Sequence, residues 1–254
     1  MGCTVSAVTS VGADYPVEYL RQLERLGVES LAVFRGGRST AFSSLWLGRE
    51  RKLRLIAPGP TIPAEIVENL SADAVLFSPV VGEIGLKHVN AYRGVKCLDL
   101  QGFVRRAASN GAITLTRLPE TIILNALVVH ASAEEATAAL GIRDICAAVK
   151  KLTRLGAENV IAGLEEGILT VSKNEGGFFT PFRVEGIMDG TGAGDILTGA
   201  FIASLLKGRG IVEATAESVA LLNQSLSYPP PHRVRNPPEK NLIEKIINTI
   251  IRLD

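Results

Sequence analysis

Short apolar runs alternate with longer amphipathic runs along this chain. Strands are indicated by runs rich in β-branched residues, namely "CTVSAVTSV", "ESLAVF", "DAVLFSP", "VKCLDL", "NALVVHAS", "ENVIAG", "ILTVS" and "FFTPF". Between several of these runs, apolar residues recur at helical spacing, as in "AEIVENL", "AEEATAAL" and "RDICAAVKKLTRLG". This alternation is typical of a mostly parallel sheet whose faces are covered by helices. The sequence therefore predicts an α/β protein.

The first predicted helix follows "CTVSAVTSV". Asp14 is its predicted N-cap, and Pro16 suits the first helical turn because its missing amide is not needed there. Leu20, Leu23 and Leu26 then recur at helical spacing. Gly27 is expected to end the helix.

One segment interrupts the alternation of strands and helices. "TAFSSLWLG" and "RKLRLIAPG" follow each other with rough polar–apolar alternation and no helical pattern between them. We expect an antiparallel pair that forms a small β lid over residues 33–56. The length of 254 residues fits one large catalytic domain, residues 1–254, with the lid as an excursion from it.

Helices dominate the predicted C-terminal part. From Ala193 to Leu206 the sequence is apolar nearly all round, as expected of a buried helix. "VEATAESVALLNQSL" predicts a second helix, and "PPPHRVRNPP" is a connector because its prolines exclude a helix. "EKNLIEKIINTIIRL" predicts a closing helix with Leu242, Ile246 and Ile250 on one face.

Composition narrows the class of protein. The chain has 27 basic and 26 acidic residues, so it lacks the basic excess typical of proteins that bind nucleic acid or anionic lipid. Its three cysteines and three histidines are dispersed, which indicates neither a disulfide framework nor a zinc site. No apolar run reaches about 18 residues, and the start lacks a signal-peptide pattern. A cytoplasmic enzyme that binds neither nucleic acid nor membrane is expected.

A glycine-rich stretch, "DGTGAGDILTGAF" over residues 189–201, stands directly before the apolar helix. Glycine clusters mark places where the backbone bends sharply or approaches another group closely. A dinucleotide-binding GxGxxG pattern fails here, because its third glycine would fall at Asp195 or Leu197. The GxxxxGK[ST] pattern of P-loops does not occur in the chain.

The same stretch fits an anion site. Backbone amides of Gly192, Ala193 and Gly194 at a helix start can converge on an anion, such as a phosphoryl group in transfer. Asp195 would repel a bound phosphate, but it is well placed to accept a proton from an attacking hydroxyl. Alternatively, the stretch is a tight turn in which Asp195 only favours the positive end of the helix dipole.

The stretch "DGTGAGD" resembles the D-T-x-G-A-G-D signature of the PfkB/ribokinase family of carbohydrate and nucleoside kinases, with Gly190 where threonine is usual. "TSVGADYPVEYLRQLERLGVE", "CLDLQGFVRR" and "VIAGLEEGILTV" are similar to further segments of that family, and the order holds from about residue 3 to 228. The resemblance implies a ribokinase-like three-layer α/β/α fold with a mostly parallel central sheet and a small β lid.

The resemblance also implies roles for the glycine-rich stretch. Asp195 matches the family's catalytic base, which takes the proton of the acceptor hydroxyl. Gly192, Ala193 and Gly194 match its anion hole.

A metal role is implied by a second motif. The family carries N-x-x-E after a mid-chain strand, and its Glu helps to organise Mg²⁺ and the waters on that ion. In the corresponding "SAEE", Glu135 matches the Glu, and Ser132 stands where Asn is expected, beside the nucleotide. Ser132 and Glu135 also fit a capping box at a helix start, and both roles are compatible.

Further positions are assigned by the same resemblance. Asp99, Gln101 and Arg105 follow a strand whose carboxyl end should face the cleft, so they are predicted to contact substrate. Arg105 fits a phosphate or an anionic substrate, and its alternative is an ordinary cation on a helix surface. The remaining implied contacts are Gly163, Gly167 and Asn223 with the nucleotide, and Asp189 with a monovalent cation, K⁺.

The start of the chain departs from the family. Members normally begin with an extra strand, an Asp-containing turn and a Gly-Gly motif that hold the sugar. This chain begins too late in that order to supply them, and Gly36-Gly37 lies between predicted strands and does not match. We expect the sugar pocket to be missing in part or rebuilt, either because the sequence continues upstream or because this is a short form.

The implied activity is transfer of the γ-phosphoryl group of ATP, with Mg²⁺, to a primary hydroxyl of a sugar or sugar-like substrate. The alternatives are a nucleoside kinase of the same family and a nucleotide-binding regulatory relative without kinase activity. The lid is expected to close over the cleft and to serve as the surface of a homodimer.

Overall fold

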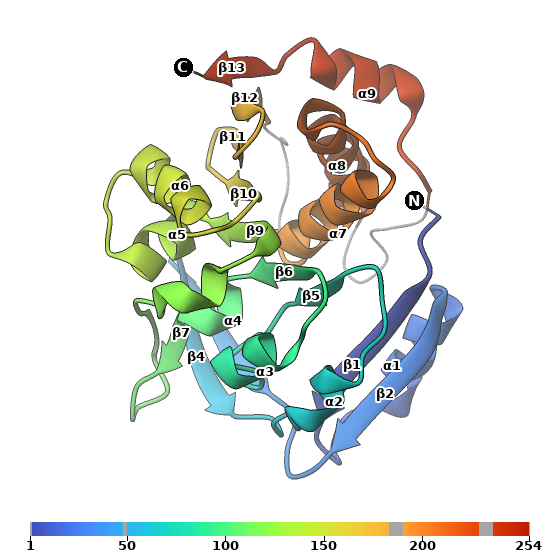
Figure 1. The fold of residues 1–254 in the computed structure, drawn as a ribbon. Helices are drawn as coiled ribbons and strands as arrows, with labels where there is room; N and C mark the ends of the chain where they lie inside the picture. The colour runs from blue at the N-terminus through green and yellow to red at the C-terminus, as the bar shows by residue number, and fades with distance from the viewer. Residues whose placement is uncertain (1, 48–49, 183–189, 229–235, 254) are drawn as a thin grey trace.

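A seven-stranded sheet forms the centre of the protein, with the strand order β13-β12-β11-β10-β9-β6-β5 (Figure 1). The structure is a computed structural model that describes residues 2–47, 50–182, 190–228 and 236–253. The strands of the sheet are β5 (Val75–Phe77), β6 (Lys96–Asp99), β9 (Ala126–Ser132), β10 (Asn159–Gly163), β11 (Gly167–Ser172), β12 (Gly176–Pro181) and β13 (Ile251–Leu253).

The first half of this sheet is parallel. β5, β6, β9 and β10 run in one direction, and β11, β12 and β13 then alternate, so that β12 runs with the parallel strands. The pairing register sets Asp99 beside His130 and Ser132 beside Gly163. Because carboxyl ends of parallel strands meet at one edge, polar residues from β6, β9 and β10 collect there.

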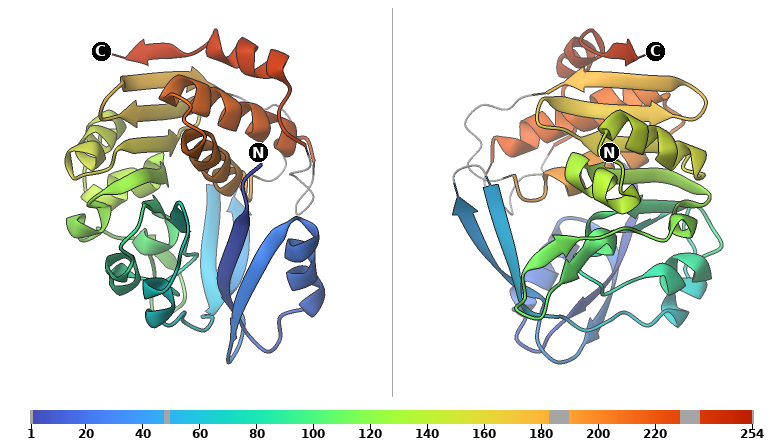
Figure 2. Two further views of the ribbon diagram at one scale, coloured as in Figure 1. Left: turned by 45° about the vertical axis from the view of Figure 1, so that its right-hand side comes forward. Right: turned by 90° about the vertical axis from the view of Figure 1, so that its left-hand side faces the viewer.

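Helices cover both faces of the sheet, and Figures 1 and 2 show the three layers. On one face lie α3 (Leu86–Ala91), α4 (Gln101–Val104), the 3₁₀ helix η1 (Glu120–Ile123), α5 (Ala133–Leu140) and α6 (Ile145–Arg154). On the other lie α7 (Ala193–Leu206), α8 (Ile211–Leu226) and α9 (Lys240–Ile247). The predicted three-layer α/β/α fold is confirmed.

Alternation along the strands divides the apolar residues between two cores. In β9, Val128 packs with Phe201 of α7, whereas Val129 belongs to the core under α5 and α6. In β10, Ile161 and Val160 divide in the same way. All of these side chains are fully buried, because successive residues of a strand point to opposite faces and both faces are covered.

Helix α7 has the predicted bounds, Ala193–Leu206. It packs against both the sheet and α8, so Leu197 and Phe201 are buried and few of its positions need to be polar. The Thr198 hydroxyl donates to the Gly194 carbonyl at 2.7 Å, which satisfies a polar group inside this apolar packing. This bond lies within the first turns of α7 and leaves the Thr198 hydroxyl satisfied although the residue is fully buried.

The N-terminal part forms smaller sheets. β1 (Val5–Val11) and β2 (Val28–Arg35) make a two-stranded parallel sheet joined by α1 (Val17–Arg25). The predicted antiparallel pair is confirmed as β3 (Ala41–Leu47) and β4 (Glu50–Ala57), which lie apart from the large sheet (Figure 2). The short helix α2 (Glu65–Glu68) and the pair β7 (Arg105–Ala107) and β8 (Ile113–Leu115) complete the described elements.

Asp14 does not cap the first helix, so that prediction is wrong. The residue before α1 is Pro16, which makes no side-chain cap. The Asp14 carboxylate instead accepts a hydrogen bond from the Ser39 amide at 2.7 Å, and this bond lowers its pKa. Since Ser39 Oγ also accepts from the Gly12 amide, these contacts fasten the end of β1 to the loop after β2.

The predicted closing helix ends earlier than expected. α9 stops at Ile247, and Ile251–Leu253 form the edge strand β13 against β12. Isoleucine-rich residues suit a strand as well as a helix, and the edge of β12 offers unpaired backbone groups. Most of the predicted connector "PPPHRVRNPP" falls outside the described residues.

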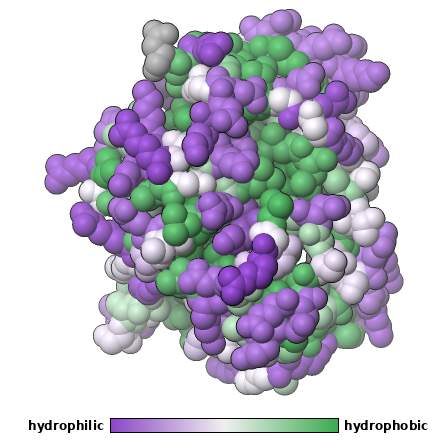
Figure 3. Space-filling model, in the orientation of Figure 1, coloured by the Kyte–Doolittle hydropathy of each residue, from purple (hydrophilic) through white to green (hydrophobic). Residues whose placement is uncertain are grey.

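Polar and charged side chains cover much of the surface in the view of Figure 3, with apolar patches between them. Among the described residues, none of the helices combines the length and the apolar character needed to span a membrane.

Candidate active site

Polar residues from β6, β9 and α7 meet at the carboxyl edge of the parallel strands. Asp99 is the last residue of β6, and His130 lies beside it on β9. Asp195 stands in the first turn of α7. The structure thus brings the two predicted aspartates together and adds a histidine that the sequence did not single out.

Glycines shape the mouth of α7, which is its N-terminal end at residues 192–195. Gly192, its N-cap, has a φ of 83°, a left-handed conformation that favours glycine. The Ala193 amide donates to the Gly190 carbonyl at 3.0 Å, so the expectation that all three amides are open is wrong for Ala193. Among the described residues, the amides of Gly192 and Gly194 have no hydrogen-bond acceptor. Two open donors therefore remain at the positive end of the helix.

The Asp195 side chain is exposed at this mouth rather than turned into the core. One carboxylate oxygen, Oδ2, lies 4.0 Å from the point that a Cβ on Gly192 would occupy. The surrounding walls remove part of its hydration, and this effect, followed by the charge of Asp99, raises the pKa of Asp195. His130 and Arg105 oppose the rise. A carboxylate with a raised pKa is a stronger proton acceptor.

Asp99 is buried, with 3% of its surface exposed, and is held by three groups. Its Oδ1 lies 3.4 Å from His130 Nδ1 and accepts from the Gln101 amide at 3.0 Å, and its Oδ2 accepts from the Ser78 hydroxyl at 3.4 Å. Burial by itself would raise the pKa of Asp99, but the neighbouring His130 side chain and the hydrogen bonds from the Gln101 amide and the Ser78 hydroxyl lower it. Asp99 is thus the more acidic of the two aspartates.

Glu135 and Ser132 form the predicted capping box at the start of α5. The Ser132 amide donates to Glu135 Oε2 at 2.9 Å, and the Glu135 amide donates to Ser132 Oγ at 3.3 Å. Arg105 Nη2 lies 3.9 Å from Glu135 Oε1, with only 15% of the Arg105 side chain exposed. Arg105 is therefore an inward-facing cation of the site, and its alternative as an ordinary cation on a helix surface is wrong.

The described residues contain no cluster of three potential metal ligands. In Glu135, Oε2 accepts from the Ser132 amide and Oε1 faces Arg105, so this carboxylate suits a metal-bound water better than direct coordination. That donor set fits Mg²⁺, which keeps several waters and is bound mainly through phosphates. Asp189, the predicted contact for a monovalent cation, lies outside the described residues.

The residues predicted to contact nucleotide differ in their packing. A Cβ on Gly167 would overlap the carbonyl oxygen of Thr180, so packing alone requires glycine there. A Cβ on Gly163 would meet nothing within 4 Å, which leaves open space at the carboxyl end of β10. Asn223 is half-buried on α8, and its carbonyl accepts from the Ser227 hydroxyl at 3.4 Å. Nucleotide binding by Gly163, Gly167 and Asn223 stays a prediction.

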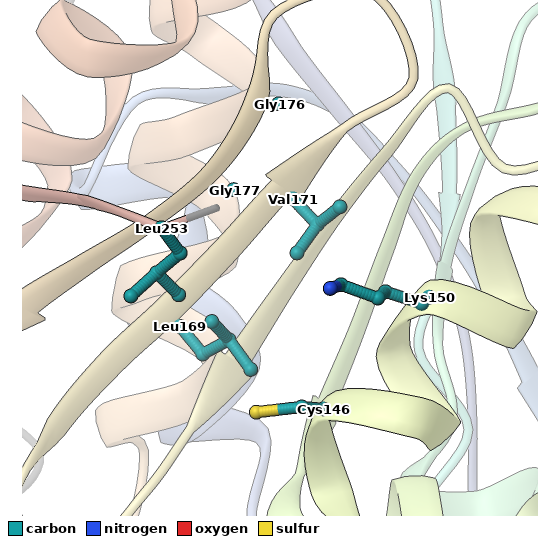
Figure 4. Close-up of a pocket in the computed structure, with 7 residues that line it drawn as sticks. All are labelled: Cys146, Lys150, Leu169, Val171, Gly176, Gly177 and Leu253. Atoms are coloured by element: carbon teal, nitrogen blue, oxygen red, sulfur yellow. The ribbon is translucent and has the colours of Figure 1, made fainter.

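Two grooves open on the described surface, each of several hundred Å³. The first, of about 460 Å³, lies between β4 and α4 and includes Leu55, Gly102 and Arg105. The second, of about 430 Å³, is walled by α6, β11, β12 and β13, with Lys150 and Cys146 on one side (Figure 4). None of the predicted site residues lines the second groove. Of the predicted site residues that the structure describes, Arg105 alone lines the first groove.

His130 is the residue that sequence reasoning missed. Three dispersed histidines indicate no site when they are only counted, because the contact with Asp99 depends on the register of β6 and β9. The available signal was positional: His130 stands two residues before Ser132, near the carboxyl end of a predicted parallel strand.

Comparison with known proteins places the chain among kinases. The model of pfkB family carbohydrate kinases matches residues 87–222. The cytidine kinase of Thermococcus kodakarensis is 26% identical over 226 residues, which cover 84% of this chain and 77% of that protein.

Solved structures share the fold. A pyrophosphate-dependent kinase in the ribokinase family, complexed with a pyrophosphate analogue and myo-inositol, superposes with a TM-score of 0.80 at 21% identity, over 96% of this chain and 86% of that one. Arabidopsis thaliana ribokinase, complexed with ribose and ATP, gives a TM-score of 0.66 at 17% identity, over 94% and 80%.

The family match spans more than half of the chain. It includes Asp99, His130, Glu135 and Asp195, the residues that meet at the carboxyl edge of the sheet. The chain belongs to the pfkB family of carbohydrate kinases.

Proposed function

We propose that this protein transfers the γ-phosphoryl group of ATP to a primary hydroxyl of a sugar or of the ribose of a nucleoside. The observation that carries the proposal is the mouth of α7. There the exposed Asp195 carboxylate, with its raised pKa, stands beside the open amides of Gly192 and Gly194. A proton acceptor and an anion site within one helical turn are what attack of an alcohol on a phosphate requires.

The reaction assigns one role to each group. Asp195 takes the proton of the acceptor hydroxyl while the oxygen of that hydroxyl bonds to the γ-phosphorus. The bond from that phosphorus to the bridging oxygen breaks, and ADP leaves with its electron pair. The amides of Gly192 and Gly194 stabilise the negative charge on the oxygens of the phosphoryl group during transfer.

Glu135 and Arg105 extend the site toward the phosphates and the acceptor. In this proposal Glu135 holds a metal-bound water through its carboxylate, and Mg²⁺, when bound with the donor, offsets the charge of the phosphates. Arg105 faces both Glu135 and the groove of about 460 Å³, so it can orient an acceptor by ionic hydrogen bonds.

The likeness to cytidine kinase favours a nucleoside acceptor, whose ribose carries a primary hydroxyl. The groove between β4 and α4 supports either acceptor class, because its volume lies in the range of pockets for small ligands. Leu55 and Phe103 supply apolar contacts there, and Arg105 supplies a charge.

Pyrophosphate is a second candidate donor. Pyrophosphate-dependent kinases superpose on this chain with TM-scores of 0.79 to 0.80, whereas the matched ribokinase structures give 0.64 to 0.67. Both donors present a terminal phosphate that the two open amides can bind.

The proposal is tested by incubating the purified protein and Mg²⁺ with ATP or pyrophosphate and a panel of pentoses, hexoses, inositols and nucleosides. Phosphorylated acceptor is identified by phosphorus NMR and mass spectrometry. Transfer to one acceptor class, lost in Asp195→Asn, supports the proposal. If ATP binds tightly but no acceptor is phosphorylated, the regulatory alternative replaces it.

A further inference from the structure

A buried pair of side chains lies below the mouth of α7 and has no role in the transfer steps above. Asp99 and His130 are 3% and 6% exposed, and their side chains approach to 3.4 Å between Oδ1 and Nδ1. Burying a carboxylate and an imidazole is costly unless each is paired. The position of this pair beneath the first turn of α7 indicates a reason for burying it.

The His130 ring supports the first turn of α7. A Cβ placed on Gly194 would lie 2.8 Å from His130 Cε1 and 3.4 Å from Nε2, so only glycine lets the helix rest on the ring at this height. Gly194 carries one of the two open amides, and Asp195 is the next residue. The ring therefore lies directly against the residue that carries one open amide and precedes the proposed base.

Asp99 in turn holds the ring. Within the described residues, Nδ1 of His130 makes no hydrogen bond of good geometry, and Asp99 Oδ1 is the charged group beside it. The Gln101 amide and the Ser78 hydroxyl fix the Asp99 carboxylate, and the Leu100 amide donates to the His130 carbonyl at 2.9 Å. A continuous set of contacts thus runs from β6 through His130 to α7.

We propose that His130 is a positioning residue of the phosphoryl-transfer site: anchored by Asp99, its ring seats Gly194 so that the open amides and Asp195 face the transferred phosphate. This inference rests on the proposed function. It also changes the role of Asp99, which acts through His130 and not through a contact with substrate.

The ring contact is tested first by a pair of substitutions at one position. His130→Leu fills similar space without a polar group, and kcat should fall about 10- to 100-fold with KM for the acceptor unchanged, since misplaced groups slow the chemical step. His130→Asn keeps an N–H near the place of Nδ1 and should recover most of kcat. Wild-type kcat in His130→Leu would overturn the inference.

A double-mutant cycle tests the contact between Gly194 and the His130 ring without relying on a single variant. Gly194→Ala drives a methyl group against the ring and should lower kcat about 100-fold or more. Adding His130→Ala removes the ring, so the double variant should be more active than Gly194→Ala alone. Losses that simply multiply would show that the two residues are not coupled and would overturn the inference.

Binding of inorganic pyrophosphate, measured by calorimetry on each variant, separates this inference from the proposed function. We expect wild-type protein to bind pyrophosphate and His130→Leu to bind it several-fold more weakly, because one of the amides is displaced. A wild-type protein that neither binds pyrophosphate or ATP nor transfers phosphate overturns the proposed function. A wild-type protein that transfers, alongside variants with unchanged kcat and unchanged binding, overturns only the role of His130.

Discussion

Asp195 lies at the mouth of α7, and Asp99 lies in the buried floor beneath it, which consists of Asp99 and His130. The surroundings of these two aspartates shift their pKa values in opposite directions. Asp195 is exposed, and partial loss of hydration and the charge of Asp99 raise its pKa. Asp99 is buried, yet His130, the Gln101 amide and the Ser78 hydroxyl lower its pKa. Two carboxylates whose environments push their pKa values apart commonly have different roles in one active site. Here the exposed one is the proposed base, and the buried one is an anchor.

The largest effect is expected at the mouth. Asp195→Asn keeps the size of the side chain but removes the proton acceptor, so kcat should fall about 1000-fold while the Kd of the donor changes little. Steady-state kinetics and calorimetry on the same preparation check both parts. A variant that keeps wild-type kcat would contradict the assignment of the base.

The second-largest effect is expected for substitution of Asp99 in the floor. Asp99→Asn removes a negative charge that raises the pKa of Asp195, so the pKa of Asp195 should fall. Because Asp195 acts in its ionised form, the acidic limb of the kcat–pH profile should move to lower pH, with kcat at its maximum reduced about tenfold by the looser His130 ring. A limb that stays in place would show that the two carboxylates are not coupled.

Stability should separate the two aspartates as well. Since the pKa of Asp99 is lowered in the folded protein, its stabilisation is present at neutral pH and is lost as the pH falls through that pKa. Asp99→Asn should therefore lower Tm by about 3 to 6 °C at pH 7 and by less in acid. The raised pKa of Asp195 has the opposite sign, so Asp195→Asn should leave Tm unchanged or slightly higher at pH 7. Thermal unfolding across pH 3 to 8 checks both signs.

The smallest effect concerns two glycines of one hairpin. The methyl group of Gly163→Ala meets open space, so the free energy of unfolding should change by less than about 0.5 kcal/mol. If the nucleotide binds against Gly163, the same methyl group should obstruct it and raise KM for ATP several-fold. Gly167→Ala is the matched control, because its Cβ overlaps the Thr180 carbonyl and should cost about 1 to 3 kcal/mol. Equal KM values in wild type and Gly163→Ala would exclude Gly163 from the donor site.

The same two regions show what a sequence can reveal. Gly192, Gly194 and Asp195 lie within one four-residue stretch, so their pattern predicts an anion site and a base directly, and the bounds of α7 follow from its nearly all-apolar sequence. The floor joins residues 99 and 130, which meet only because β6 and β9 pair in a particular register. Sequence pattern does not contain that register, so the contact between His130 and Asp99 could not be predicted, and only the place of His130 near the carboxyl end of a predicted strand was a usable signal.

Other misses have similar physical causes. Asp14 is a suitable N-cap by type, but the amide of Ser39, distant in sequence, competes for its carboxylate. The residues of β13 suit a helix by periodicity, but pairing with β12 decides their conformation. In both cases a tertiary contact outweighs a local preference.

The pH dependence of single-turnover phosphoryl transfer, with donor and acceptor saturating, tests the central claim most directly. The account predicts that the wild-type rate falls in acid with one ionisation above the ordinary aspartate pKa of 3.8, and that Asp195→Asn lacks this limb and is slow throughout. The same acidic limb in both proteins, or equal transfer rates, would contradict Asp195 as the base.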